Sequence, residues 1–474
     1  MKSKAYFLGL KKEESIYLIS IIILFLCINL FRINYYPIYV DEAFTYLNFS
    51  SKGFVSSMTR YPEPNNHVFF SLISNIFYHF PFESIFNLRL PNLIIGGITS
   101  ITLYIFLRKE FSHKVAVIPH VLFTFSYVFS FYSVFARGYM LIMFFTLISI
   151  ICLYHLYQRF NSKDLIIFSI CSILGFYTIP IYLYVYATFS IFLSFLIYKK
   201  HLTFKYFFIS NLVIGLCVLL LYAPIIYFNG IDAIINNKFT QKIERTVVLD
   251  YITSNGKGVY DKLLGVKSGL VLLLLTISLI FVTIKTPNKL KQQTVLAILL
   301  FLYLPFLYML LHSVIPGTRT WCFILIPFVF GITILINEFY KIIPINKYII
   351  YVGGIMLIII QGNIFIKSHP KYAHPFDRVG EMIARKVMDN GYQNFYFDNK
   401  EVLSEQVFIE FAYHKRHKKI HVNNHCSKKL NLDSFDCVIY KNDVILNQKI
   451  STNFIEIYKD YSITIMGKRK RKTQ

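Results

Sequence analysis

The chain has 474 residues, of which 55% are hydrophobic, 18% are aromatic and only 16% are charged. Soluble domains average about 25% charged residues, so this composition excludes an ordinary soluble protein and indicates extensive lipid-facing surface. The formal net charge of +24 is compatible with nucleic-acid binding, but the basic residues gather in short loops between apolar runs, which is typical of membrane proteins. We therefore expect membrane lipids, and no nucleic acid, as partners.

Apolar stretches of about 18 to 22 residues recur along the chain, and each is long enough to cross a bilayer as a helix. We predict eleven spans, near residues 16–32, 89–107, 115–132, 138–157, 164–178, 180–198, 205–227, 267–285, 293–311, 320–338 and 347–366. The first run lacks a small-residue cleavage site, so we expect an anchor and not a removable signal peptide. The predicted fold class is mainly α, a polytopic membrane protein of about eleven transmembrane helices.

Every second loop between these spans carries lysine and arginine, whereas the alternate short loops carry almost none. By the positive-inside rule the basic loops are cytoplasmic. Segments 33–88, 133–137, 228–266 and 312–319 then lie outside, on the outer face of an inner (cytoplasmic) membrane. An odd number of spans sends the C-terminus to the same side.

The two long outer loops differ in what they reveal. Segment 33–88 contains an amphipathic run, 68–80, which we predict to be a helix lying at the outer interface. A further span there would invert every later loop and break the charge pattern. Segment 228–266 is mixed in polarity, and its sequence does not predict particular elements.

The composition changes after residue 366, so we expect a transmembrane domain over 1–366 and a small extracytoplasmic α/β domain over 367–474. Its apolar spacing predicts helices at 376–390 and 402–413, strands at 394–398 and 436–440, and a terminal hairpin at 454–466. The basic run 468–472 is expected to contact anionic headgroups or to be solvated. The sequence leaves the role of this region open, with recognition of an acceptor polymer or of a partner subunit as the two expectations.

Four polar features converge on the predicted outer face. They are Asp41 with Glu42, the stretch Asn65-Asn66-His67, Arg137 with Tyr139, and Arg319. A carboxylate beside a span costs free energy to place near lipid, so such residues usually face water or have a function. A carboxylate can act as a general base. Arginines can clamp a phosphate group. Together these groups suggest group transfer from a phosphate-activated donor, and a lipid-linked donor would explain the membrane fold.

Each feature also has an ordinary structural explanation. The acidic pair can cap a helix, His67 can be a hydrogen-bonded loop residue, and both arginines can anchor to headgroups. Arg60 in the first long loop is expected either to touch substrate or to be solvated.

Several short motifs then carry a resemblance. Asp41-Glu42-Ala43-Phe44 after the first span resembles the Asp-Glu signature of GT-C membrane glycosyltransferases, in the branch of protein mannosyltransferases, aminoarabinose transferases and lipopolysaccharide core transferases. Similar matches, in the family's order over about residues 1–340, are Asn65-Asn66-His67-Val68-Phe69-Phe70, Arg89-Leu90-Pro91-Asn92-Leu93, Ala136-Arg137-Gly138-Tyr139 and Pro316-Gly317-Thr318-Arg319-Thr320.

The resemblance implies that Asp41 activates the acceptor, with Glu42 as polar support in the catalytic pair. It implies that Arg137 and Arg319 hold the carrier phosphate. His67 and its neighbour Asn66, with Tyr139 and Arg60, belong to the expected donor and substrate site.

The chain also departs from the family pattern. Phe135 replaces an acidic residue often seen before Ala-Arg, and Val68 replaces a proline. No cofactor is certain, and a divalent metal stays an open alternative that Phe135 disfavours.

The predicted function is transfer of a sugar from a polyprenyl-phosphate-linked donor to an extracytoplasmic glycan, lipid or protein acceptor. One alternative is a lipid-linked oligosaccharide transporter or polymerase-type carrier, which predicts polar residues along a path through mid-membrane. The predicted spans carry almost no charge at their centres, which disfavours a carrier. A non-catalytic membrane scaffold is the third alternative.

Overall fold

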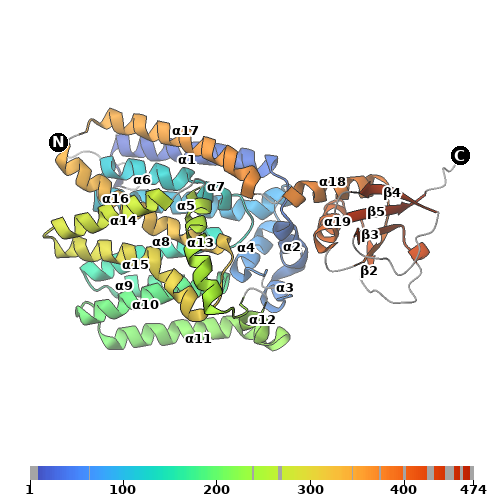
Figure 1. The fold of residues 1–474 in the computed structure, drawn as a ribbon, viewed down its shortest axis with the longest axis horizontal. Helices are drawn as coiled ribbons and strands as arrows, with labels where there is room; N and C mark the ends of the chain where they lie inside the picture. The colour runs from blue at the N-terminus through green and yellow to red at the C-terminus, as the bar shows by residue number, and fades with distance from the viewer. Residues whose placement is uncertain are drawn as a thin grey trace.

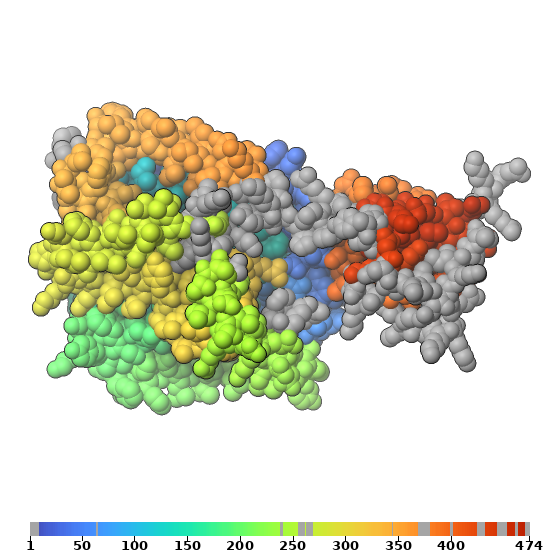
Figure 2. All heavy atoms as spheres, viewed as in Figure 1, coloured from blue at the N-terminus to red at the C-terminus, as the bar shows by residue number. Residues whose placement is uncertain are grey.

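Long helices form a bundle, and a small region containing a sheet projects from one end of it (Figures 1 and 2). The computed structural model describes residues 9–62, 65–237, 240–264, 269–343, 345–372, 375–398, 402–423, 432–442, 453–459 and 463–469. The predicted basic tail beyond residue 469 lies outside these residues.

Seven helical segments in the described residues are long and apolar enough to cross a membrane. They are α1 (Lys12–Tyr35), α5 (Ser84–Glu110), α8 (Tyr139–Gln158), α11 (Phe204–Asn229), α15 (Lys289–His312), the 3₁₀ helix η3 (Thr318–Ile324) continued by α16 (Leu325–Ile342), and α17 (Lys347–Tyr372). The expected polytopic helical fold is therefore confirmed.

The predicted count of eleven spans is not confirmed. The remaining predicted spans form shorter helices: α6 (His113–Phe125) with α7 (Tyr127–Tyr132), α9 (Ser162–Thr178), α10 (Tyr182–Tyr198) and α14 (Gly269–Lys285). A helix of 17 residues, such as α9, reaches only about 26 Å, slightly less than a hydrocarbon core of about 30 Å. Ser126 separates α6 from α7 because its backbone is extended and its hydroxyl accepts from the N–H of Phe129.

Ion pairs hold helix ends together at the end of the bundle where the chain begins. Glu14 on α1 pairs with Arg108 on α5 at 2.8 Å, and Glu13 pairs with Lys347 on α17 at 3.1 Å. The region containing the sheet lies at the opposite end (Figure 1). The basic loops predicted to share one face therefore lie at the end distant from the C-terminal region.

Short helices follow α1 at this opposite end. They are α2 (Val40–Asn48), the 3₁₀ turn η2 (Ser50–Lys52), α3 (Gly53–Thr59) and α4 (Val68–Tyr78). The predicted interfacial helix is α4, which packs against α3 and α5 and buries Ser71, Ser74 and Asn75. Its position at the membrane interface stays a prediction. The second long loop forms α12 (Asp232–Ile235) and α13 (Arg245–Leu264), which the sequence did not predict.

The C-terminal region combines two helices with a five-stranded sheet. The helices are α18 (Pro375–Asp389) and α19 (Leu403–Lys415), and the strands are β1 (Asn394–Phe397), β2 (His421–Asn423), β3 (Cys437–Lys441), β4 (Phe454–Lys459) and β5 (Ile463–Lys468). The strand order is β2-β1-β3-β5-β4, with β1 parallel to both neighbours and β5 antiparallel to β3 and β4. The expected helices, strands and terminal hairpin are present, and β2 was missed because it has only three residues.

Helix α19 packs directly on α2. The ring of Tyr46 on α2 lies edge-on to Phe411 at 5.1 Å and to His414 at 5.4 Å, and it is almost fully buried. The C-terminal region therefore contacts the same short helix that carries Asp41 and Glu42.

Candidate active site

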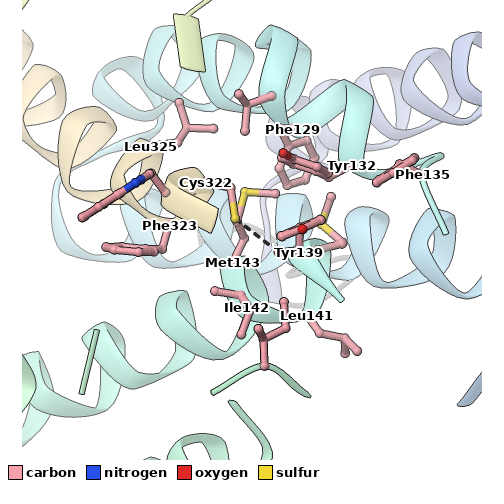
Figure 3. Packing of buried hydrophobic residues seen from close by; sticks show 14 of the residues in the cluster. Phe129, Tyr132, Phe135, Tyr139, Leu141, Ile142, Met143, Cys322, Phe323 and Leu325 are labelled. Atoms are coloured by element: carbon pink, nitrogen blue, oxygen red, sulfur yellow. Dashed lines mark hydrogen bonds between the residues drawn. The ribbon is translucent and has the colours of Figure 1, made fainter. Parts of the chain in front are cut away.

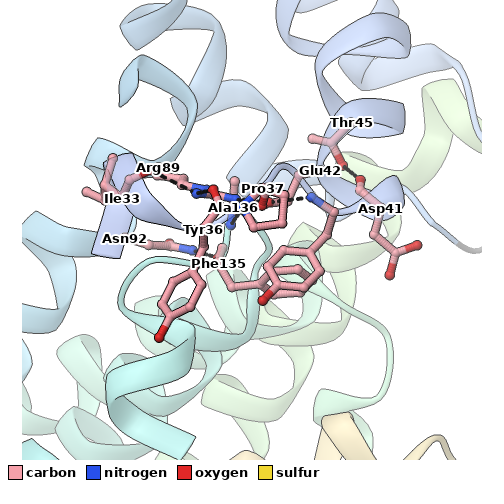
Figure 4. Close-up of polar contacts among 11 residues, drawn as sticks. Ile33, Tyr36, Pro37, Asp41, Glu42, Thr45, Arg89, Asn92, Phe135 and Ala136 are labelled. Atoms are coloured by element: carbon pink, nitrogen blue, oxygen red, sulfur yellow. Dashed lines mark hydrogen bonds and ion pairs between the residues drawn. The ribbon is translucent and has the colours of Figure 1, made fainter. Parts of the chain in front are cut away.

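Helix α2 points its two acidic side chains in different directions. Asp41 and Glu42 are consecutive, and successive side chains on an α-helix diverge by about 100°. Figure 4 shows Glu42 directed toward Arg89 and Ala136, whereas Asp41 points away from them. The two carboxylates therefore have separate surroundings and can have separate roles.

Glu42 is enclosed by hydrogen-bond donors. Its side chain is 0% exposed and forms an ion pair of 2.6 Å with Arg89, whose side chain is 1% exposed. Its two oxygens also accept from Arg89 Nε at 3.0 Å, the N–H of Ala136 at 2.8 Å and the N–H of Tyr39 at 3.0 Å. With four donors on one carboxylate, Glu42 joins α2, α5 and the loop before α8, and no oxygen faces an opening.

The remaining N–H groups of Arg89 donate to backbone carbonyls in the segment that connects α1 to α2. It donates to the carbonyl oxygens of Ile33 and Tyr36 at 3.0 Å each and of Pro37 at 2.7 Å. Sequence reasoning used Arg89 only as part of a motif and did not identify it as the partner of Glu42. A buried arginine in a span near an outer carboxylate was the available signal.

Asp41 pairs with an arginine 278 residues away along the chain. Its carboxylate forms an ion pair with Arg319 in η3, and the two side chains are 21% and 43% exposed. Burial raises the pKa of the Asp41 carboxyl, but the charges of Arg137 and Arg319 outweigh burial and hold that pKa below its usual value. The structure thus presents a charged carboxylate and a guanidinium that water and a ligand can reach.

Arg137 is also close to Asp41, but it is 1% exposed. Its guanidinium donates to the carbonyl of Asn65 at 2.7 Å and to the hydroxyl of Thr45 at 2.9 Å, and it also bonds the side-chain oxygen of Asn65. Its Nε has no hydrogen-bond partner among the residues that the structure describes. Arg137 therefore fixes the 65–67 loop against α2 and adds positive charge behind Asp41.

His67 lies between Arg137 and the start of α8. Its Nδ1 accepts from the N–H of Gly138 at 2.7 Å, and its Nε2 is 3.1 Å from the Arg137 guanidinium. Burial, with the charges of Arg137 and Arg319, lowers the pKa of His67 well below its usual value, so the ring is neutral. This close approach needs a glycine, because a Cβ on Gly138 would lie 2.5 Å from Thr178 Cγ2 and 3.1 Å from His67.

Tyr139 belongs to an aromatic layer behind the polar groups. Its ring is 4.8 Å from Tyr132 and 5.0 Å from His67, and Cys322 donates a weak hydrogen bond to its carbonyl at 3.6 Å (Figure 3). This layer packs η3, which carries Arg319, against the start of α8.

Asn66 and Arg60 have other surroundings. The buried amide of Asn66 donates to the carbonyls of Ser57 at 2.8 Å and Arg60 at 3.0 Å and accepts from Ser71 at 2.8 Å, so it shapes the first loop. The Arg60 side chain is exposed. The structure therefore gathers Asp41, His67, Arg137, Tyr139 and Arg319, and it leaves Glu42 and Asn66 in supporting contacts.

The site offers little to a metal ion. Among the residues that the structure describes, no three His, Cys, Asp or Glu side chains lie close enough together to bind a metal ion. Phe135, where the sequence resemblance leads one to expect an acidic residue, packs on Tyr39 at 5.2 Å and on Phe131 at 5.1 Å. A hydrophobic contact therefore fills this position.

Comparison with known proteins gives a match in structure alone. No family model and no curated protein sequence match the chain. ArnT from Cupriavidus metallidurans bound to undecaprenyl phosphate superposes with a TM-score of 0.60 and 10% identity, covering 95% of this chain and 97% of that one. ArnT in the apo state gives a TM-score of 0.57, 11% identity and the same coverage. At such low identity the likeness shows a shared fold, the one that the sequence resemblance implied.

Proposed function

We propose that the chain is an integral membrane glycosyltransferase of the GT-C type, a hexosyl- or pentosyltransferase. It would move a sugar from a polyprenyl-phosphate-linked donor to an acceptor on the outer face of a cytoplasmic-type membrane. The pairing of Asp41 with Arg319, two side chains that are both partly exposed, is the observation that carries this proposal. The shared fold with ArnT, an aminoarabinose transferase, supports the same reaction class, and its complex with undecaprenyl phosphate supports a lipid-phosphate donor.

In the proposed reaction, an acceptor hydroxyl oxygen attacks the anomeric carbon of the donor sugar. The bond from that carbon to the phosphate oxygen breaks, and its electron pair leaves with the carrier phosphate. Asp41 takes the proton of the hydroxyl, and Arg319 offsets the negative charge that grows on the phosphate. The direct displacement inverts the anomeric centre.

The ion pair itself suggests how donor binding prepares the base. In the structure the charges of Arg137 and Arg319 together hold the Asp41 pKa below its usual value, and Arg319 also donates a hydrogen bond to the carboxylate, which is therefore weakly basic. A donor phosphate would compete for Arg319 with two charge-assisted hydrogen bonds. Once Arg319 turns to the phosphate, Asp41 loses a stabilising partner and becomes a stronger base.

The other polar groups would hold this pair in place. We assign Glu42 with Arg89 to the positioning of α2, because no oxygen of Glu42 faces an opening. Arg137 and His67 would set the 65–67 loop and the local charge, and Tyr139 would support η3 from behind. Direct contact of Arg60 with substrate stays a proposal that its exposure permits.

The test is Asp41→Asn in purified protein reconstituted into proteoliposomes. Transfer from a polyprenyl-phosphate sugar is expected to fall by about 10²–10⁴, the usual worth of a general base, while binding of a short-chain polyprenyl phosphate persists. Asp250→Asn is the matched control, because Asp250 is an exposed carboxylate on α13. Undiminished transfer by Asp41→Asn would contradict the proposal. Movement of the lipid-linked sugar between leaflets without a new glycosidic bond would favour the carrier.

A further inference from the structure

Residues of both the helix bundle and the C-terminal region line a polar cleft, which shares no lining residue with the Asp41 site. Its cavity volume is about 660 Å³, within the range of small-molecule sites. Asn34, Tyr35 and Tyr36 at the end of α1 and Glu83 before α5 form one wall. Glu381 and Arg385 on α18, with Lys415 on α19, form the other. The cleft therefore joins two parts of the chain that are far apart in sequence.

The charges that line this cleft are balanced. Glu83, Glu381 and Asp389 oppose Arg385, Lys386 and Lys415. Lys415 forms an ion pair with Glu83 across the cleft, and Arg385 pairs with Glu381 at 2.7 Å along α18. Neither sign dominates, so the lining does not select an anionic phosphate, which would need an excess of arginine and lysine. It offers hydrogen-bond donors and acceptors in nearly equal supply to a neutral ligand rich in hydroxyls.

The paired charges remain available for such contacts. The Arg385 side chain is 69% exposed and Glu83 is 54% exposed. Surface ion pairs of this kind contribute at most about 1 kcal/mol, so a ligand hydroxyl can replace part of each pair at little cost.

The cleft also lies where a span leaves the membrane. Helix α1 ends at Tyr35, and Phe31 and Tyr35, one turn apart, are 66% and 64% exposed with their rings stacked at 5.3 Å. An exposed tyrosine at the end of a span belongs at headgroup depth. Tyr35 also lines the cleft. An amphiphile can therefore lay its alkyl chain along Phe31 while its polar head enters the cleft.

We propose that this cleft binds the sugar head group of a membrane-anchored amphiphile. Carbohydrate hydroxyls require hydrogen-bond donors and acceptors, which the paired charges and the Asn34 amide supply. The apolar face of a sugar ring packs on an aromatic ring, which Tyr35 supplies. The inference does not depend on the chemistry at Asp41. Under the proposed function, it gives the C-terminal region a role in holding a sugar-bearing lipid beside the reactive end of the bundle.

A photoreactive alkyl maltoside, with a diazirine on the sugar, tests this inference on the full chain in lipid nanodiscs. Crosslinks mapped by mass spectrometry are expected in peptides that contain residues 33–37 and 381–389. Dodecyl maltoside should compete for labelling, and dodecylphosphocholine, which has the same alkyl chain and a zwitterionic head, should not. Competition by both detergents would mean that any lipid head group enters the cleft and would overturn the proposal.

Variants on both walls complete the test. Arg385→Ala and Asn34→Leu should each lower labelling about tenfold, the factor that one hydrogen bond to a charged or amide group supports. Arg416→Ala is the matched control, because Arg416 is an exposed arginine of the same region outside the cleft. Labelling that both wall variants leave unchanged would refute the site. A transferase assay is not needed, so failure here leaves the Asp41 chemistry untouched, and loss of the Asp41 proposal leaves the cleft untouched.

Discussion

Substitution of Glu42 by glutamine, which has the same shape, should destabilise the contacts that hold α2 against α5 and the loop before α8. Four N–H donors converge on the Glu42 carboxylate, two from Arg89 and one each from the backbones of Tyr39 and Ala136. A glutamine oxygen has two lone pairs, and its amide nitrogen brings two more donors into a space already full of them. The Arg89 charge would then stay buried without a counter-ion.

Breaking a buried ion pair by removing one partner typically costs about 3–5 kcal/mol in the free energy of unfolding. We expect Glu42→Gln to fall in this range. Arg89→Met should cost at least as much, because three backbone carbonyls between Ile33 and Pro37 also lose their donor. The double variant should cost less than the sum of the two, with a coupling energy of about 0.5–3 kcal/mol.

Unfolding by denaturant in detergent, followed by tryptophan fluorescence, measures these changes. Trp321 is the only tryptophan of the chain, and it is buried in η3 against Phe306 at 4.9 Å. Lys341→Met is the control, because it breaks an exposed ion pair with Glu338 and should cost no more than about 1 kcal/mol. If Glu42→Gln shifts the free energy of unfolding no further than this control does, the account of the Glu42–Arg89 contact is wrong.

Three further predictions concern the neighbouring groups. Arg319→Ala should lower transfer by about 10²–10³, whereas Arg319→Lys, which keeps the charge but not the fork, should retain part of the rate; donor titrations in a transfer assay measure both. Gly138→Ala should cost about 1–3 kcal/mol because its Cβ meets Thr178 Cγ2 at 2.5 Å, and adding Thr178→Ser should recover part of the loss in thermal unfolding. His67 stays neutral when folded, so the unfolded chain alone takes up its proton as the pH falls below about 6.5. When the pH falls from well above 6.5 to 5.5, the free energy of unfolding of the wild type should therefore decrease by about 1.4 kcal/mol more than that of His67→Gln. An equal decrease in both proteins would count against a neutral buried ring.

Hydropathy was sufficient to predict the long apolar helices because it reflects local composition. The composition of a short apolar helix such as α9, which has 17 residues, did not reveal whether it crosses the whole bilayer. Segment 245–264 became helix α13 although its mean polarity is mixed, since packing against α15 supplies what the sequence pattern lacks.

The candidate site was predictable as a set of residue types but not as a set of contacts. The sequence placed Asp41, Arg137 and Arg319 on one face from loop positions alone. It contained no signal that Arg319 would form the ion pair with Asp41 while Arg137 donates hydrogen bonds to Asn65. These contacts depend on how η3 and α8 pack. Glu42 and Arg89 are 47 residues apart, and only the folded chain reveals that each is the other's counter-ion.

The packing of the Tyr46 ring against Phe411 and His414 has a consequence for biosynthesis. Helix α2 lies within the first 50 residues of the chain and is therefore synthesised early. The surface that covers Tyr46 belongs to α19, near residue 410. Synthesis proceeds from the N-terminus at about 5–20 residues per second, so α2 waits through nearly the whole of translation before its neighbour exists. A chain truncated before α19 would therefore leave the Tyr46 ring uncovered, although Glu42 and Arg89 already join α2 to α5.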